Sequence, residues 1–242
     1  MQTTKLLYLE NFSQLNTQAK VVGLSELDGR ISVILDQTVF YPQGGGQPFD
    51  QGHISSDDAL FFAEDVRFID GLVHHYGHFD HGKFIDGQTV SCEVDPIRRG
   101  LHSRLHSAGH VIDMALKRLE INWVPGKGYH FPQGPYVEYI GELGESNRDE
   151  LKENIEKVCN EIISEDLQTK LEFISPVQAE DRGFEVPGNI VESGKPIRIV
   201  FYGDFGILCG GTHVSHLSEI GEMTIRKIKP EGQNIRVGYD IK

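Results

Sequence analysis

Residues 95–119 read DPIRRGLHSRLHSAGHVIDMALKRL, and the character of the sequence changes within this stretch. Pro96 suits the first turn of a helix, where its missing N–H is not needed. Apolar residues then recur every three or four positions, which is the period of one helix face. They are Ile97, Leu101, Leu105, Ala108, Ile112, Ala115, Leu116 and Leu119. We predict a helix over residues 96–119, weakened at Gly109, because glycine costs ~1 kcal/mol relative to alanine in a helix interior.

The segment before this helix, residues 4–95, has the composition of short strands separated by turns. The turn dipeptides are Asp28-Gly29, Asp70-Gly71 and Asp86-Gly87. The expected strands are Lys5–Leu9, Ala19–Leu24, Arg30–Leu35, Leu60–Arg67, Leu72–Tyr76 and Thr89–Val94. Short strands at this spacing favour a small barrel or sandwich. We find no convincing helix before residue 96.

After this helix in the sequence, helical and strand patterns alternate. A second helix is expected from about Asn147 to Asp166, where apolar residues again follow a helical period. Strands are expected at Tyr136–Ile140, Lys170–Ile174 and Ile197–Tyr202, followed by a hairpin of Glu222–Lys229 and Asn234–Tyr239. The expected fold class is therefore α+β. Residues 1–95 would form a small β-barrel, and residues 96–242 an α/β domain with an antiparallel sheet.

The composition is that of a folded protein, with 242 residues, 38% hydrophobic and 24% charged. It excludes collagen-like, coiled-coil and disordered classes. No apolar run approaches the ~18–20 residues that span a bilayer, and the N-terminus lacks the pattern of a signal peptide. The three cysteines are too few and too scattered for a disulfide framework. We therefore expect a cytoplasmic protein without a membrane partner.

Two short motifs carry residues that bind metals. His106 and His110 are four positions apart, which places both imidazoles on one helix face. The sequence Cys209-Gly210-Gly211-Thr212-His213 follows an apolar strand, and its two glycines permit a tight turn between Cys209 and His213. Three imidazoles and a thiolate suit Zn²⁺. Taken singly, each motif has an ordinary alternative, namely polar helix histidines and a buried cysteine beside a turn.

Two further segments attract attention. Residues 41–52, YPQGGGQPFDQG, contain three consecutive glycines that allow a close backbone approach to a ligand. They lack the features of a P-loop or dinucleotide fingerprint, and a glycine-rich hairpin loop is the alternative. The second segment holds four histidines without a cysteine or a tightly turned pair, and we interpret it as a surface loop. Its histidines are His74, His75, His78 and His81.

YPQGGGQPFDQG, DPIRRGLHSRLHSAGH and LCGGTHVSHLSEIGEMTIRKI occur in this order along the chain. Together they resemble the glycine-rich, HxxxH and CxxxH motifs of the AlaX family. These free-standing alanyl-tRNA editing proteins are related to the editing domain of alanyl-tRNA synthetase and, more distantly, to that of threonyl-tRNA synthetase. The resemblance runs from about residue 40 to the C-terminus. It implies a zinc-binding editing domain with His106, His110, Cys209 and His213 as ligands.

The resemblance also implies an activity, a partner and further site residues. The expected function is a zinc-dependent trans-editing hydrolase that deacylates seryl- or glycyl-tRNA(Ala) and binds the acceptor end of this tRNA. Catalysis would run through the four zinc ligands, with Thr212 as a further catalytic candidate. Nucleotide and ATP binding are carried over from the family alone. The other expected substrate-binding or polar-contact residues are Gly44, Gly45, Gly46, Gln47, His102, Arg104, Ser107 and Thr212.

The net charge of −13 does not favour broad affinity for nucleic acid. Residues 1–95 carry a net charge of −9 and residues 96–242 a net charge of −4, so a narrow strip in the second part is favoured. The candidates are Arg98, Arg99, Arg104, Lys117, Arg118 and Lys127, or Arg226, Lys227 and Lys229. Two other functions stay open: a non-catalytic tRNA- or protein-binding module with structural zinc, and editing of another mischarged tRNA, such as one of the threonine system.

Overall fold

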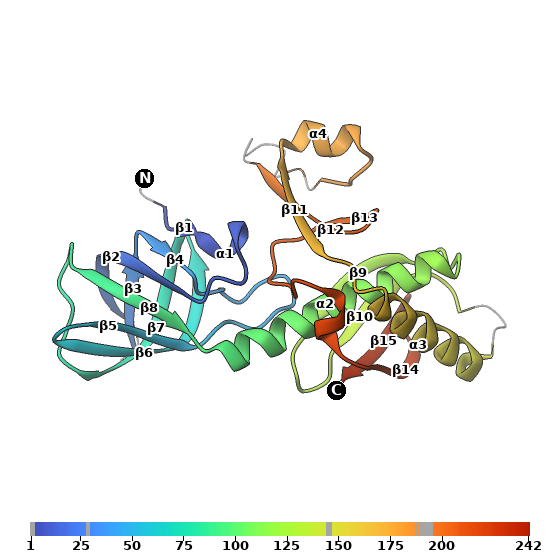
Figure 1. The fold of residues 1–242 in the computed structure, drawn as a ribbon, viewed down its shortest axis with the longest axis horizontal. Helices are drawn as coiled ribbons and strands as arrows, with labels where there is room; N and C mark the ends of the chain where they lie inside the picture. Colours follow the sequence, from blue (N-terminus) through green and yellow to red (C-terminus); the bar gives the residue numbers. More distant parts are fainter. Residues whose placement is uncertain (1–2, 28–29, 144–146, 187, 189–195) are drawn as a thin grey trace.

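Six strands of the N-terminal part close into a barrel (Figure 1). The computed structural model describes the whole chain except residues 1–2, 28–29, 144–146, 187 and 189–195. The barrel strands are β2 (Asn16–Leu27), β3 (Arg30–Leu35), β5 (Gly52–Ser56), β6 (Ala59–Ile69), β7 (Leu72–His81) and β8 (Thr89–Val94). Their order is β2-β3-β7-β6-β5-β8, and each strand is antiparallel to its neighbours. The prediction of an N-terminal barrel is confirmed.

The first predicted strand is largely wrong. Only Lys5–Leu6 is a strand, β1, which pairs with β4 (Gln37–Thr38), and Leu7–Glu10 forms the short helix α1. Leu7 and Tyr8 are both buried. Two adjacent residues of a strand point to opposite faces, so burying both side chains favours a helical turn. Strand β5 was not predicted from the sequence. The predicted turn at Asp28-Gly29 lies outside the described residues.

The second part is built around α2 (Pro96–Arg118), which begins beside the barrel. Asp95 caps it, and its side chain accepts hydrogen bonds from the N–H groups of Ile97 and Arg98. A second helix, α3 (Arg148–Ser164), packs against α2. Both helices lie on a four-stranded antiparallel sheet in the order β14 (Met223–Glu231), β15 (Asn234–Ile241), β10 (Tyr136–Ile140) and β9 (Val124–Tyr129).

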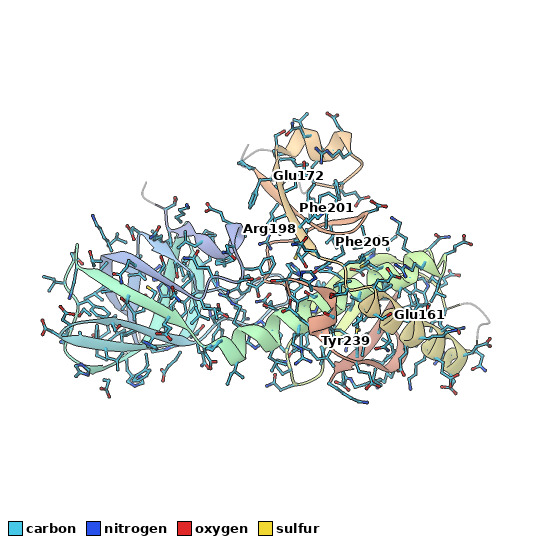
Figure 2. The ribbon with its side chains drawn as sticks, in the orientation of Figure 1. Glu161, Glu172, Arg198, Phe201, Phe205 and Tyr239 are labelled. Atoms are coloured by element: carbon cyan, nitrogen blue, oxygen red, sulfur yellow. The ribbon has the colours of Figure 1, made fainter. Side chains whose placement is uncertain are left out.

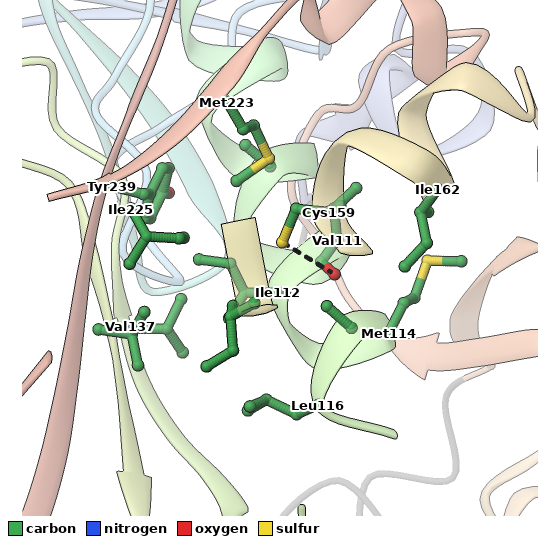
Figure 3. Close-up of a cluster of buried hydrophobic side chains, with 14 of the residues drawn as sticks. Val111, Ile112, Met114, Leu116, Val137, Cys159, Ile162, Met223, Ile225 and Tyr239 are labelled. Carbon is green, nitrogen blue, oxygen red and sulfur yellow. Dashed lines mark hydrogen bonds between the residues drawn. The ribbon is translucent and has the colours of Figure 1, made fainter. Parts of the chain in front are cut away.

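The core of this part lies between the two helices and the sheet (Figure 3). Ile112 and Val111 of α2, Ile162 of α3 and Ile225 of β14 are all fully buried. Cys159 also lies in this core, and its thiol is close to the carbonyl oxygen of Val111, with an S···O distance of 3.9 Å. The apolar face predicted for each helix therefore packs inward, except at Ile97 in the first turn of α2, which is exposed.

A second, three-stranded antiparallel sheet stands above α2 in Figure 1. It consists of β11 (Thr169–Ile174), β12 (Ile197–Tyr202) and β13 (Phe205–Leu208), with the short helix α4 (Pro176–Asp181) after β11. A single 3₁₀ turn, Leu217–Ile220, follows the CGGTH motif. The sequence analysis missed β9 and α4, and it gave no bounds for the strand before Cys209, which is β13. No helix in the described part of the chain is long and apolar enough to cross a membrane.

Two buried arginines join these parts. Arg99 of α2 forms an ion pair with Asp50 of the glycine-rich segment and donates to the carbonyl oxygens of Phe12 and Val39. Arg198 of β12, labelled in Figure 2, lies where the N-terminal segment, the three-stranded sheet and the loop after β13 meet. It donates to carbonyl oxygens of Leu9, Cys209 and Gly211, with an Nε···O distance of 2.8 Å to Cys209.

Candidate metal centre

Four side chains from two distant parts of the sequence converge beside α2. His106 and His110 come from the middle of this helix, and Cys209 and His213 come from the loop that follows β13. One donor atom from each of the four residues lies within 4.8 Å of all the others. The Cys209 Sγ atom is 3.3 Å from Nε2 of His106. This group is therefore compact enough to hold a single metal ion.

The Nδ1 atoms of the three imidazoles are bound to other side chains. His106 Nδ1 is 2.7 Å from Oε1 of Gln47, and His110 Nδ1 is 3.3 Å from Oδ2 of Asp113. His213 Nδ1 is 3.0 Å from the hydroxyl of Tyr202. This leaves the three Nε2 atoms for the centre.

The Nε2 atoms of His110 and His213 are buried without a hydrogen-bond partner among the described residues. Burying a polar atom without a partner costs roughly 1–3 kcal/mol. A cation between these atoms would satisfy them, and three nitrogens with one sulfur form a known ligand set for structural and catalytic metals. Partners that fix the other ring nitrogen are also typical of histidines that bind metals. The residues present therefore fit a metal ion.

The electrostatics of the centre favour the thiolate form of Cys209. Burial by itself raises the pKa of Cys209, but His106 and His213 outweigh this effect and hold the pKa well below its ordinary value. The thiolate is the form that binds metals. Burial lowers the pKa of His110, but the hydrogen bond to Asp113 and the nearby Cys209 raise it by more, with a net rise to about 10. His110 therefore carries the proton that a metal ion would displace.

The two glycines of the CGGTH motif have different roles. A Cβ atom added at Gly211 would lie 2.1 Å from Cε1 of His106, whereas one added at Gly210 would meet no atom within 4 Å. Neither glycine is among the residues with positive φ. Besides the bend that it allows between Cys209 and His213, Gly211 is needed because the His106 ring packs directly against its Cα atom.

The glycine-rich segment reaches into the centre through Gln47, which is fully buried. Its Oε1 atom accepts from His106 and from the Thr212 N–H, and its Nε2 atom donates to the Thr212 hydroxyl at 2.9 Å. Gly46 has φ +76°, and an added Cβ atom would lie 2.1 Å from the carbonyl oxygen of Gly128. The loop therefore packs closely against the second part of the chain.

A cavity of about 680 Å³ opens beside the donor group. Gly44 and Gly45 of the glycine-rich loop form part of its wall. The wall also includes His106, Gly109, His110, Asp113, Gly128, His130, Cys209, Gly210 and Gly211. His130 is the functional candidate that the sequence analysis missed, because no motif or spacing connects it with the four donors. Its ring stacks on His106, with the ring centroids 4.5 Å apart.

Several predicted site residues do not line this cavity. Thr212 and Ser107 are buried, and their hydroxyl groups are engaged within the protein, by Ser103 and Gln47 for Thr212 and by Tyr202 and Val214 for Ser107. His102 is buried on α2, and burial lowers its pKa to about 4. Arg104 donates to the carbonyl oxygens of Ile220 and Lys242.

The four histidines of residues 74–81 do not form a loop, so this interpretation is wrong. All four belong to strand β7. His75 points into the barrel, fully buried, and hydrogen-bonds to Thr38 and to the carbonyl oxygen of Val33. His78 and His81 are exposed and lie beside Glu64 and Asp80. Among the described residues, the only group that could hold a metal is that of His106, His110, Cys209 and His213.

The basic residues predicted to bind tRNA are of three kinds: buried, paired with acidic side chains, or exposed. Arg99 is buried in its ion pair with Asp50 and cannot reach a nucleic acid. The side chains of Arg118, Arg226 and Lys229 pair with Glu165, Asp240 and Glu231. Arg98 is partly buried and donates to the carbonyl oxygen of Phe49. The side chains of Lys117, Lys127 and Lys227 are exposed.

Comparison with known proteins agrees with the motif resemblance. The family model for class II (A) tRNA synthetases matches residues 4–98, and the model for the threonyl and alanyl tRNA synthetase second additional domain matches residues 197–237. The alanine–tRNA ligase of Methanobrevibacter smithii is 35% identical over 234 residues, which are 93% of this chain and 25% of that ligase. That of Methanopyrus kandleri is 34% identical over 224 residues, 92% of this chain and 24% of the ligase.

A third relative, the alanine–tRNA ligase of Halorubrum lacusprofundi, is 32% identical over 231 residues, 95% of this chain and 24% of the ligase. The chain thus spans about a quarter of the length of the curated relatives it matches. The matched region of the chain contains both the barrel and the CGGTH motif. The resemblance that the three motifs indicated is therefore confirmed.

Proposed function

We propose that this chain, a homologue of the alanyl-tRNA synthetases, is a trans-editing hydrolase that deacylates mischarged alanine tRNA. It would cut the ester that joins serine or glycine to the 3′-terminal ribose of tRNA(Ala). A synthetase pocket rejects a near-isostere of its amino acid only weakly, so a second, hydrolytic sieve is needed. The observation that carries the proposal is the convergence of four metal-binding side chains beside a cavity that three of them, His106, His110 and Cys209, help to line.

Zn²⁺ is the proposed metal, held by His106, His110, Cys209 and His213. The N₃S donor set and the unpartnered Nε2 atoms of two of these histidines support this choice. When bound, Zn²⁺ polarises a carbonyl oxygen or lowers the pKa of a water molecule. In this proposal the exposed backbone of Gly44 and Gly45 contacts the acceptor end of the tRNA, because both glycines line the cavity.

The remaining parts of the proposal concern the contacts with tRNA and the location of the activity. Lys127 and Lys227 are exposed and would contact tRNA phosphates. We place the activity in the cytoplasm. A binding module with structural zinc would need no cavity at its metal ligands, so the cavity beside Cys209 and His106 favours the enzyme.

The decisive experiment is deacylation of a panel of mischarged tRNAs by the purified chain. The panel contains seryl- and glycyl-tRNA(Ala) together with seryl-tRNA(Thr), and each reaction is repeated after chelation and after zinc is restored. We expect turnover of the alanine tRNAs that disappears with the chelator and returns with zinc. Turnover of seryl-tRNA(Thr) alone would shift the function to the threonine system. Full zinc occupancy without turnover of any tRNA would favour the binding module.

A matched pair of cysteine variants controls for unspecific loss of structure. Cys209→Ala removes a proposed ligand, whereas Cys92→Ala removes an equally small buried thiol inside the barrel. We expect Cys92→Ala to keep its zinc and its activity. Loss of zinc from both variants would show that metal content reports folding and not ligation.

A further inference from the structure

His130 occupies a position that the four donors do not explain. It lies between β9 and β10, is 4% exposed and forms part of the cavity wall. Its ring is nearly parallel to that of His106, with an angle of 19° and a centroid distance of 4.5 Å. A fourth imidazole therefore lies against the metal centre without belonging to the donor group.

Three glycines from different elements leave room for this ring. A Cβ atom added at Gly46, Gly109 or Gly128 would lie 3.4, 2.5 or 2.3 Å from the nearest atom of the His130 ring. Gly109 lies in the middle of α2, where glycine costs about 1 kcal/mol relative to alanine. The weak point that the sequence shows in this helix is therefore space for His130, and both parts of the chain contribute to its slot.

The hydrogen bonds of Tyr239 fix the tautomer of His130. The Tyr239 hydroxyl donates its single proton to the carbonyl oxygen of Leu105 at 2.8 Å. Its 2.7 Å hydrogen bond with His130 Nδ1 therefore requires that Nδ1 carries a proton and donates it. A neutral imidazole with a proton on Nδ1 has a free lone pair on Nε2.

The Nε2 lone pair of His130 is not used within the described part of the protein. Among the described residues this nitrogen has no hydrogen-bond partner, yet it does not belong to the side-chain atoms that are fully buried without one. Because the residue lines the cavity, a small molecule inside can reach this lone pair. A fixed acceptor beside a metal centre is the arrangement that a general base requires.

We propose that His130 is a catalytic residue whose Nε2 atom acts as general base; this inference rests on the deacylase function proposed above. The oxygen of a water molecule bonds to the ester carbonyl carbon while one of its protons passes to Nε2. The bond between that carbon and the ribose oxygen then breaks, and Nε2 returns the proton to the ribose oxygen. The products are the free amino acid and the tRNA with its ribose hydroxyl restored.

The test compares variants of the full chain. In His130→Asn, the amide nitrogen takes the place of Nδ1 and still donates to Tyr239, but the acceptor at Nε2 is lost. We expect kcat for seryl-tRNA(Ala) to fall by roughly 10²–10⁴-fold, the usual contribution of a general base, while zinc content stays at the wild-type level. The same change at His75, which is buried in the barrel, should leave kcat unchanged.

Two results would overturn the proposal. A kcat of His130→Asn close to that of the wild type would exclude a base at this position. Loss of zinc together with activity would instead mean that the ring only supports His106 through stacking. If the wild type deacylates no tRNA of the panel, the proposed function itself fails, which is a different outcome from an active His130→Asn variant.

A spectroscopic measurement adds a readout that does not depend on turnover. In ¹⁵N-histidine-labelled protein, several rings should have a protonated Nδ1 and an unprotonated Nε2, among them His75, and we expect one signal of this kind to disappear in His130→Asn. In Tyr239→Phe, Nδ1 loses its acceptor, so the proton should redistribute between the two nitrogens of this ring. A proton found on Nε2 of His130 in the wild type would contradict the proposal.

Discussion

Two groups of histidines stand out in this chain: one converges on a candidate metal centre, and the other is spread along one strand. Those at the centre come from α2 and from the loop after β13, and their donor atoms gather within 4.8 Å together with Cys209. Those of β7 are closer in sequence, with four histidines in the eight residues from His74 to His81, and they disperse. Density in the sequence is therefore a poor guide to convergence in space.

The difference lies in the element that carries the residues. On a helix, residues four apart are neighbours with Cβ atoms ~5–6 Å apart. On a strand, residues four apart are ~13 Å apart, and adjacent residues point to opposite faces. His75 therefore enters the barrel core, whereas His74, its neighbour, bonds to Ser32. Four histidines on one strand have no common point at which to bind an ion.

The strongest test of this contrast removes donors from each group. We expect Cys209→Ala and His106→Ala to lose the metal and to lower deacylation by at least ~10³-fold, because a metal supplies several kcal/mol of transition-state stabilisation. His78→Ala and His81→Ala should behave as the wild type, since both side chains are exposed. Metal analysis and single-turnover deacylation measure both effects. Undiminished turnover in metal-free Cys209→Ala would contradict the assignment.

The two glycines at the centre provide a finer test. Gly211→Ala places a methyl group against the His106 ring, and overpacking of this kind costs about 1–3 kcal/mol. Because the ring is a donor, we expect lost metal affinity as well as a lower melting temperature. Gly210→Ala meets no atom within 4 Å and serves as the control. Equal metal affinity in the two variants would show that the ring can move aside.

His75, the buried histidine of β7, should affect the pH dependence of stability and should not affect metal binding. Burial lowers the pKa of His75 to about 4, below the 6.5 of a free histidine. Between these values the unfolded chain binds more protons, so the stabilisation is complete above pH 6.5 and is lost as the pH falls towards 4. The loss amounts to about 3 kcal/mol at 1.36 kcal/mol per pKa unit. Urea unfolding should show it in the wild type, and His75→Gln should lack this part of the slope.

The smallest effect is expected where the barrel reaches the metal centre. Gln47→Ala removes the acceptor for His106 Nδ1, and such supporting residues typically contribute 10–100-fold to metal affinity or activity. Gln51→Ala, on the same segment, removes a hydrogen bond to the carbonyl oxygen of Glu64 outside the centre. We expect only the first variant to bind zinc more weakly in a competition titration. Equal affinities would assign Gln47 to loop packing alone.

The features predictable from the sequence are those set by local spacing. The helical period around Pro96, and with it the face shared by His106 and His110, is an i, i+4 pattern. The turn at Asp70-Gly71 is likewise local, and both residues have positive φ. The first strand could not be predicted correctly, because the burial of Leu7 depends on packing against the barrel core and that of Tyr8 on packing against Tyr41.

The supporting residues of the centre depend on contacts between distant positions, and no local pattern encodes them. Gln47 could be named from its glycine-rich neighbours, but its hydrogen bond to Thr212 joins positions 165 residues apart. His130 has no motif, and its relation to Gly109 and Tyr239 exists only in the folded chain. Likewise, the need for Gly211 arises from a ring that is 105 positions away in the sequence.

The insertion of Gln47 has a consequence for how this molecule could be divided or recombined. The boundary near Asp95 invites a cut, since the barrel on one side of it is closed and the other side keeps every donor residue. Such a fragment would inherit the ligands but not the amide that orients His106 and holds Thr212. The barrel and the donor domain would therefore have to be kept together. A fusion or gene split at this boundary would leave the metal ligands without the Gln47 side chain that orients His106.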